Sequence, residues 1–370
     1  MVETVDHRAW RQVRIPWGVD ENGDILYWRP ALEPHMVVTG TTGGGKTVLL
    51  DGIILEICAN DWPCILIDGK GTEFLGFATW PNVQLVATET WEHVAVLHHI
   101  RRLVEERRQM VKRGHKQEAD FSPLFLIIDE YADIRDEVTR WYTTVKGRGD
   151  PAKAPMLLML ASIARIARSF KIHIVLGLQR PDVEFLTGEM RDNMRARVAM
   201  GKLSPDGSKM MFDSYSAGVA VPQIAGRSTC MDGHNRIREA QVWWTPDPRR
   251  VAPDNASDVD ILRGLLPQHS SHERLVIIPP RQKSTGEEVV QPTYQDYAHA
   301  ALVPARERRD LEDHVVDYHR RLFLQADHLR GEHDPQDSAV LIEASTAHHA
   351  AEPDDSSPAA AASWPDDGML

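Results

Sequence analysis

Short apolar runs alternate with longer amphipathic stretches over the first two thirds of the chain. Helical periodicity predicts helices over Lys46–Cys58, Trp91–Arg113 and Pro155–Phe170. The apolar runs predict strands over Met36–Thr39, Cys64–Asp68, Val83–Val86, Leu124–Asp129, Ile172–Gly177, Arg197–Met200 and Ala240–Trp244. Strands that alternate with helices favour a mostly parallel sheet covered on both faces. The pattern therefore predicts an α/β fold.

The flanks of this pattern differ from its centre. Ile15–Trp28 predicts a β-hairpin that turns at Asp20–Gly23. Composition changes near Thr245–Pro248, and a helical pattern returns near Asp310–Arg330. The stretch Gly331–Leu370 is too rich in Asp, Ala, Ser and Pro to bury a core, which predicts disorder. We therefore divide the chain into an N-terminal β segment (1–30), an α/β domain (31–250), a partly helical extension (251–330) and an acidic tail (331–370).

Composition narrows the class of protein. The chain has 370 residues, of which 42% are hydrophobic, so it can bury a sizeable core. No run approaches the roughly 18 uncharged apolar residues of a membrane span, and Met1–Arg14 is charged and polar. The three cysteines have no metal-ligand spacing and are expected to be reduced thiols. We expect a cytoplasmic protein with no transmembrane segment of its own.

The net charge of −12 is unevenly distributed along the chain. Residues 101–250 carry 26 Lys and Arg against 19 Asp and Glu, whereas both flanks are acidic. A basic middle is compatible with a nucleic-acid partner, and equally with chance and a solvated acidic tail. Charge alone therefore does not choose the partner.

A glycine-rich sequence follows the first predicted strand. It matches the P-loop pattern G-x-x-x-x-G-K-[ST] and comprises Gly40, Thr41, Thr42, Gly43, Gly44, Gly45, Lys46 and Thr47. Such a loop lets backbone N–H groups converge on phosphate oxygens at a helix start. Lys46 is expected to reach the β- and γ-phosphates of ATP, and the Thr47 hydroxyl to ligate Mg²⁺. The alternative is a fortuitous glycine turn, which the strand and helix on either side disfavour.

The run Leu124–Ile128 ends in two carboxylates, Asp129 and Glu130. Ligands bind at the carboxyl ends of parallel strands, so both side chains are expected near the phosphates. Asp129 would hold Mg²⁺ through water, and Glu130 would act as the base that activates the attacking water. An acidic helix N-terminus is the alternative for this pair taken alone.

Two more strand tips carry polar residues. Gln179 follows the run that begins at Ile172 and could bond the γ-phosphate or the attacking water, or be an ordinary loop residue. Asp68-Gly69-Lys70 also faces the expected nucleotide edge, with no defined role.

Several stretches together resemble the FtsK/SpoIIIE family of double-stranded DNA translocases. They run in the family's order over residues 10–247: Ile15–Asp20, His35–Thr47, Ile67–Lys70, Ile128–Asp133, Ala164–His173, Gln179–Asp182 and Leu186–Gly188. The stretch around Gln179-Arg180-Pro181 is more specific than the P-loop, which many ATPases share. The resemblance implies a RecA-like motor that hydrolyses ATP as a homo-hexameric ring around duplex DNA.

The resemblance also assigns roles to arginines and lysines. Arg168 matches the position of the arginine finger that reaches a neighbour's nucleotide, with Arg165 as its rival and a helix-surface arginine as the alternative. Arg180 and Arg191 flank the segment that the family places against DNA. The segment after Glu130 departs from the family in being longer than usual, and its basic loop, which contains Lys146 and Arg148, is either an enlarged pore loop or a solvated connection.

The chain departs from the large family members in carrying no recognisable membrane helices or winged-helix module. It resembles the compact plasmid-transfer proteins of actinomycete conjugative elements. That similarity implies transfer of a conjugative plasmid or integrative element, with a possible membrane-bound transfer partner. The alternatives are a protein-secretion ring ATPase, a chromosome or phage DNA-segregation motor, and a nucleotide-gated adaptor.

Overall fold

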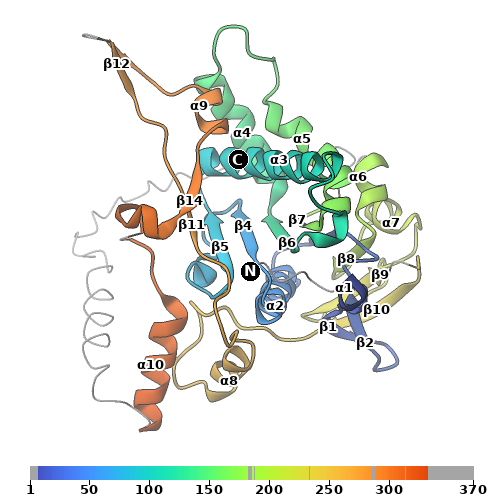
Figure 1. Ribbon diagram of the computed structural model, residues 1–370. Coiled ribbons are helices and arrows are strands. Elements are labelled where there is room, and N and C mark those ends of the chain that lie inside the picture. Colours follow the sequence, from blue (N-terminus) through green and yellow to red (C-terminus); the bar gives the residue numbers. More distant parts are fainter. Residues whose placement is uncertain are drawn as a thin grey trace, which may run out of the picture.

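The computed structural model describes residues 7–181, 186, 188–232, 234–285, 288–312 and 314–331. A ten-stranded sheet in the order β2-β1-β10-β9-β8-β3-β7-β6-β4-β5 runs through the main body (Figure 1). Six strands form its parallel part: β3 (Met36–Gly40), β4 (Cys64–Asp68), β5 (Val83–Ala87), β6 (Leu124–Asp129), β7 (Ile172–Leu178) and β8 (Ala196–Met200). The predicted α/β class is confirmed.

Four antiparallel strands extend the sheet beyond β8: β9 (Arg227–Met231), β10 (Ile237–Val242), β1 (Ile15–Asp20) and β2 (Ile25–Trp28). The predicted hairpin is β1–β2, and it pairs with β10 instead of standing apart. The prediction of a strand over Ala240–Trp244 was wrong in its bounds, and β9 was missed. Both strands mix apolar with polar and charged residues, so their sequences lack a continuous apolar run.

Alternate side chains of the parallel strands enter two separate cores. Leu126 and Ile128 of β6 face one core, while Phe125 and Ile127 face the other. The first core is covered by α3 (Thr90–Lys112), α4 (Tyr131–Val145) and α5 (Pro155–Ala167). The second is covered mainly by α2 (Lys46–Ala59), with Trp10 of α1 (His7–Gln12) beside it. The predicted helices are thus present, although α5 ends at Ala167 and a 3-10 turn, Arg168–Phe170, completes the predicted range.

Two short helices complete the body on the side of β8. They are α6 (Gly188–Asn193) and α7 (Pro205–Phe212), and Met190 and Phe212 bury their side chains in the first core. Among the residues that the structure describes, no helix is long and apolar enough to cross a membrane.

The extension after residue 250 returns across the α/β domain (Figure 1). It contains α8 (Ala256–Gly264), β11 (Leu275–Ile277), β12 (Lys283–Thr285), β13 (Glu288–Val290), α9 (Tyr294–Ala298), β14 (Leu302–Pro304) and α10 (Tyr318–Arg330). Tyr294 is fully buried against α3, where its hydroxyl accepts a hydrogen bond from the Met156 N–H at 3.0 Å. Leu322 of α10 joins the second core. The acidic tail predicted to be disordered lies outside the described residues, apart from Gly331.

Candidate nucleotide-binding site

The P-loop lies between β3 and α2, at the carboxyl edge of the parallel strands. Gly43 and Gly45 have φ values of 81° and 98°, a region that side chains with a Cβ rarely adopt. A Cβ on Gly40 would lie 2.7 Å from the Cβ of Met200 on neighbouring β8. The sequence therefore needs glycine both for the turn and for the close packing of strands beneath it. Helix α2 begins at Lys46 and directs its first N–H groups toward the loop.

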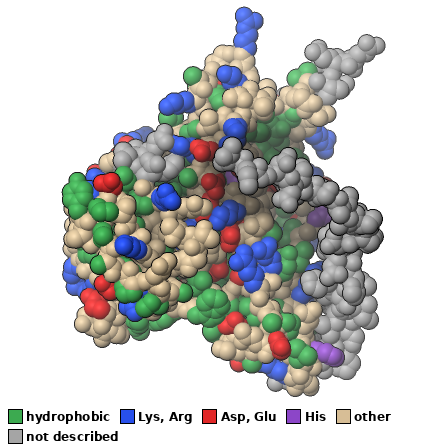
Figure 2. All heavy atoms as spheres, turned by 180° about the vertical axis from the view of Figure 1, so that it is seen from behind, with side chains coloured by type: hydrophobic (Ala, Val, Ile, Leu, Met, Phe, Trp, Pro, Cys, Tyr) green, Lys and Arg blue, Asp and Glu red, His purple; other side chains and the backbone are tan. Residues whose placement is uncertain are grey.

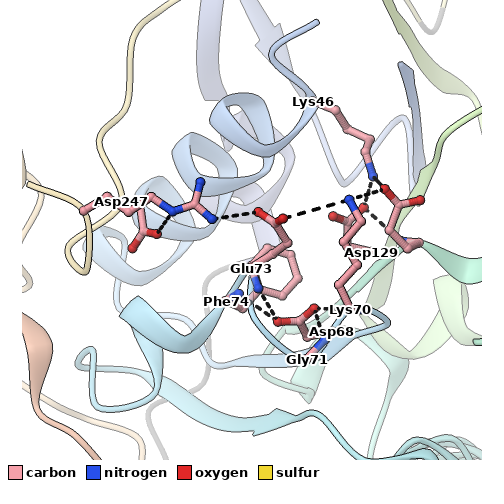
Figure 3. Close-up of polar contacts among 10 residues, drawn as sticks. Lys46, Asp68, Lys70, Gly71, Glu73, Phe74, Asp129 and Asp247 are labelled. Carbon is pink, nitrogen blue, oxygen red and sulfur yellow. Dashed lines mark hydrogen bonds and ion pairs between the residues drawn. The ribbon is translucent and has the colours of Figure 1, made fainter. Parts of the chain in front are cut away.

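Lys46 points from the P-loop to the end of β6, where it forms ion pairs with both predicted acids (Figure 3). Its Nζ lies 2.7 Å from Glu130 Oε1 and also contacts Asp129 Oδ1. All three residues are more than 90% buried. A Cβ on Gly177 of β7 would lie 2.2 Å from Asp129 Oδ1, so this glycine leaves room for the carboxylate. The structure thus brings together the lysine and both acids that the sequence singled out.

The surroundings of the two acids shift their pKa values in opposite directions. Burial raises the pKa of Asp129 above its usual value despite the ion pair with Lys46. Burial also acts to raise the pKa of Glu130, but hydrogen bonds from Lys46 and Lys70 outweigh it and leave that pKa lowered. Asp129 Oδ2, Glu130 Oε2 and Thr39 Oγ1 are buried and have no hydrogen-bond partner among the described residues. Unsatisfied oxygens of this kind fit a site that completes itself with a metal ion or with water.

A cavity of about 440 Å³ opens beside the P-loop. It is lined by the loop, Thr47 and Glu130, beside which phosphates would lie, and by the Ala225–Gly226 turn, Gln241, Trp243 and Trp244. The two tryptophans are 39% and 60% exposed, so they offer aromatic surface on which a nucleobase can stack. This volume and this combination of polar and aromatic lining residues suit a nucleotide.

A chain of ion pairs continues from the two acids along the wall of the cavity (Figure 3). Lys70 Nζ lies 3.0 Å from Glu130 Oε1 and 3.9 Å from Glu73 Oε1. Arg250 Nη2 then lies 3.4 Å from Glu73 Oε2, and its Nε lies 3.3 Å from Asp247 Oδ2. Residues from the end of β6, the loop after β4 and the segment after β10 are therefore electrostatically connected at one edge of the sheet.

Asp68, to which the sequence assigned no defined role, binds the backbone of the loop that follows β4. Its carboxylate accepts four backbone hydrogen bonds from the loop that follows it, donated by the N–H groups of Lys70, Gly71, Glu73 and Phe74 at 2.7–3.1 Å. The side chain is fully buried. Asp68 thus holds the loop, and Lys70 is the residue of this motif that reaches the cavity.

Gln179 and Arg168 lie near opposite ends of β7. Thr39 pairs with Leu178 in parallel register, so Gln179 leaves the sheet at the P-loop edge, although it is exposed and does not line the cavity. Arg168 precedes β7 and is exposed at the other edge. The seven residues of this strand span roughly 20 Å, which separates Arg168 from the P-loop of its own chain. Arg165, its rival, lies 3.4 Å from Glu189 in an exposed ion pair.

The four candidate DNA-binding residues lie on the surface, in two places. Arg180 is exposed directly after β7, and Arg191 of α6 lies 3.4 Å from Asp213. The alternative partners considered for Arg180, Asp182 and Glu184, lie outside the described residues. Lys146 and Arg148 are exposed on the α4–α5 connection. Figure 2 shows Lys and Arg side chains gathered on the projecting part at the top, where Figure 1 draws this connection.

Sequence reasoning missed the part of the cavity lining that β10 and the segment after it supply. Gln241, Trp243, Trp244 and Arg250 come from a region whose strand bounds were predicted wrongly. Two adjacent tryptophans were the one visible signal, but their position beside the P-loop depends on antiparallel pairing of β10 with β9 and of β9 with β8. That pairing has no local signature.

The matching family model and the similar curated proteins carry the same family name, FtsK. A family model described as the FtsK/SpoIIIE family matches residues 3–122. The chain is 26% identical over 219 residues to the DNA translocase FtsK of Chlamydia trachomatis, which covers 56% of this chain and 27% of the relative. It is 27% identical over 255 residues to the DNA translocase FtsK of Streptomyces coelicolor, covering 59% and 26%. The chain thus spans about a quarter of the length of these curated relatives.

Solved structures share the fold. The pCW3 conjugation coupling protein TcpA, solved with ATPγS, aligns with a TM-score of 0.54 at 21% identity, covering 70% of this chain and 73% of that one. ATPases 2 and 3 of EccC from Thermomonospora curvata align with a TM-score of 0.56 at 18% identity, covering 82% and 58%. The chain is thus similar to the FtsK/SpoIIIE family over residues 3–122, the part that holds the P-loop, and to proteins named DNA translocase FtsK over somewhat more than half of its length.

Proposed function

We propose that the protein is an ATP-driven translocase of double-stranded DNA that transfers a conjugative plasmid or integrative element between cells. The observation that carries the ATPase part is that Lys46 and Glu130 line one nucleotide-sized cavity, where Lys46 forms ion pairs with both Glu130 and Asp129. The DNA part rests on similarity to proteins named DNA translocase, which align with 56% and 59% of this chain.

Hydrolysis requires the contacts around Lys46 to change. When ATP enters, the β- and γ-phosphates attract the Lys46 ammonium away from the two carboxylates, which frees Glu130 to meet a water molecule. Glu130 Oε2, which has no partner among the described residues, then takes a proton from the water that attacks the γ-phosphorus. The bond from this phosphorus to the β–γ bridging oxygen breaks, giving ADP and phosphate. Thr47 and Asp129 would hold Mg²⁺, which neutralises charge on the phosphates.

A ring is the natural setting for Arg168. The edge of the sheet that carries this arginine is remote from the P-loop of its own chain, so it can serve a nucleotide only in a neighbouring copy. A homo-hexamer would place each nucleotide between two subunits. Gln179, at the P-loop edge of β7, would sense the γ-phosphate from within the same subunit.

Duplex DNA would contact four basic residues, of which Arg191 is only partly exposed. Arg180, Arg191, Lys146 and Arg148 can neutralise phosphates without reading bases, as a motor that moves along any sequence requires. The Asp150 carboxylate accepts the Gly147 N–H at 2.8 Å, and this bond fixes the turn that carries the two basic residues of the α4–α5 connection.

The conjugation setting is supported by likeness of fold. The chain shares its fold with a protein named as a conjugation coupling protein. Movement of DNA between cells would need a membrane-bound partner. The fold is shared equally with a type VII secretion ATPase, so a ring that moves protein is the second candidate.

ATP hydrolysis with and without partners separates these functions. Linear duplex DNA should stimulate the purified protein several-fold, whereas unfolded peptides should not. Stimulation by peptides alone would favour secretion. Slow hydrolysis that neither partner changes would favour a nucleotide-gated adaptor.

A further inference from the structure

Lys70 stands at the cavity wall with no role in the chemistry described so far. Its backbone is held firmly, because Asp68 binds the loop from Lys70 to Phe74 and Gly69 packs on the end of β6. A Cβ on Gly69 would lie 2.9 Å from the carbonyl oxygens of both Asp129 and Glu130. The Gly69 N–H also donates to the Asp129 carbonyl at 3.3 Å. The loop therefore presents Lys70 at a fixed place beside the two acids.

Two lysines share a single oxygen of Glu130. Lys46 Nζ lies 2.7 Å and Lys70 Nζ 3.0 Å from Oε1, whereas Oε2 has no partner among the described residues. The Lys70 side chain is 33% exposed, so its ammonium remains partly hydrated while that of Lys46 is buried. Glu73, which is itself paired with Arg250, lies on the other side of Lys70 at 3.9 Å.

Bound ATP should affect the contacts of the two lysines with Glu130 differently. Lys46 belongs to the P-loop, and bound phosphates compete for its charge. Lys70 comes from a separate loop that Asp68 holds, so it can stay on Oε1 after Lys46 has left. Without a second cation, the buried Glu130 would lose its ion pair at the moment the base is needed, and a buried unpaired carboxylate is unfavourable.

We propose that Lys70 is a positioning residue for hydrolysis, which retains Glu130 Oε1 when Lys46 turns to the phosphates and so keeps Oε2 directed at the attacking water. This inference rests on the proposed role of Glu130 as the base. Glu73 and Arg250 then hold Lys70 from behind and connect this position to the segment after β10.

The test compares Lys70→Met, Lys70→Arg and a charge-matched control, Lys112→Met, at an exposed position on α3. ATPγS binding is measured by calorimetry and ATP hydrolysis under single-turnover conditions, each in wild-type and Glu130→Gln backgrounds. Lys70→Met should slow hydrolysis roughly 10²-fold, the scale of a misplaced catalytic group, and leave ATPγS affinity unchanged. Lys70→Arg, which keeps the charge, should retain most of the rate, and Lys112→Met should retain all of it.

The double variant separates positioning from a merely structural role. In the Glu130→Gln background, Lys70→Met should change the rate by less than about twofold, since its effect passes through the missing carboxylate. An equal reduction of the hydrolysis rate in both backgrounds would overturn the proposal. A roughly tenfold weaker affinity for ATPγS in Lys70→Met would also overturn it, because Lys70 would then bind the phosphates. If Glu130→Gln hydrolyses ATP slowly while Lys70→Met hydrolyses it at the wild-type rate, only the role of Lys70 is overturned. A Glu130→Gln variant as fast as wild type would instead remove Glu130 as the base.

Discussion

The nucleotide edge of the sheet and the candidate DNA surface carry charge in opposite ways. At the nucleotide edge, Lys46, Asp129 and Glu130 are buried and bound to one another. On the candidate DNA surface, Arg180 and Arg148 are exposed to water. Buried charges must be paired, so the fold itself sets their positions, whereas exposed charges await a partner.

Variants at the buried edge should act on chemistry, and variants on the exposed surface should act on binding. Changes at the buried edge remove a partner from a low-dielectric site and should have large effects that salt screens little. Changes on the exposed surface should have modest effects that depend strongly on salt. The variants below are ordered by the size of the expected effect.

Lys46→Ala should abolish hydrolysis, with a reduction of roughly 10³-fold or more, because the transferred phosphoryl group loses its main protein counter-charge. Removal of Lys46 also leaves Asp129 and Glu130 with less compensation in the absence of nucleotide, so the melting temperature should fall. Steady-state ATPase assays and thermal melts measure both. Hydrolysis at the wild-type rate would refute the site.

Arg168→Ala should lower hydrolysis by about 10³-fold, as expected when an arginine finger is removed, without disturbing nucleotide binding. Because the residue would act on a neighbour, mixing Arg168→Ala with Lys46→Ala protein should restore part of the activity at boundaries that carry neither defect. Arg165→Ala tests the rival arginine on the preceding helix, and it should keep most of the activity. Full activity of Arg168→Ala would transfer the role to Arg165 or to neither arginine.

Glu130→Gln should bind ATP normally and hydrolyse it about 10²-fold more slowly or worse, the usual effect of removing a general base. The amide keeps the shape of the side chain and removes its basicity. Nucleotide binding and single-turnover rates distinguish this outcome from a structural role, in which binding would disappear together with turnover.

The double variant Arg180→Ala/Arg191→Ala should leave basal ATPase nearly unchanged while weakening DNA binding and DNA stimulation. Each arginine that no longer neutralises a DNA phosphate should reduce the log–log salt slope by about 0.9. The measurement is duplex affinity across a salt series. A joint fall in basal ATPase and thermal stability would show that these arginines hold the surrounding structure, a role to which the Arg191–Asp213 pair would contribute.

The sequence predicted the parallel half of the fold well because most of its strands are apolar runs buried on both faces, as in β4 and β6. Cys64–Asp68 and Leu124–Asp129 have the predicted bounds. The P-loop and the two acids were also predictable, because glycine patterns and strand ends are signals that a short stretch of sequence carries. The antiparallel half was harder, because β10 has the sequence Ile-Arg-Glu-Ala-Gln-Val and lacks any long apolar run.

The remaining parts of the site depend on contacts between distant residues. Trp244 lines the cavity, and its Nε1–H donates to Asp258 of α8 at 2.8 Å. Arg250 reaches Glu73 across a separation of 177 positions. Neither contact follows from periodicity or composition. This part of the cavity lining could therefore be identified only from the structure.

Movement along DNA is the central claim, and displacement of a third strand measures it most directly. A labelled oligonucleotide bound as a triplex at the end of a linear duplex is incubated with the protein and ATP, with Glu130→Gln as the matched control. The account predicts ATP-dependent displacement by the wild-type protein and none by Glu130→Gln. ATP hydrolysis that duplex DNA stimulates but that leaves the triplex intact would contradict translocation.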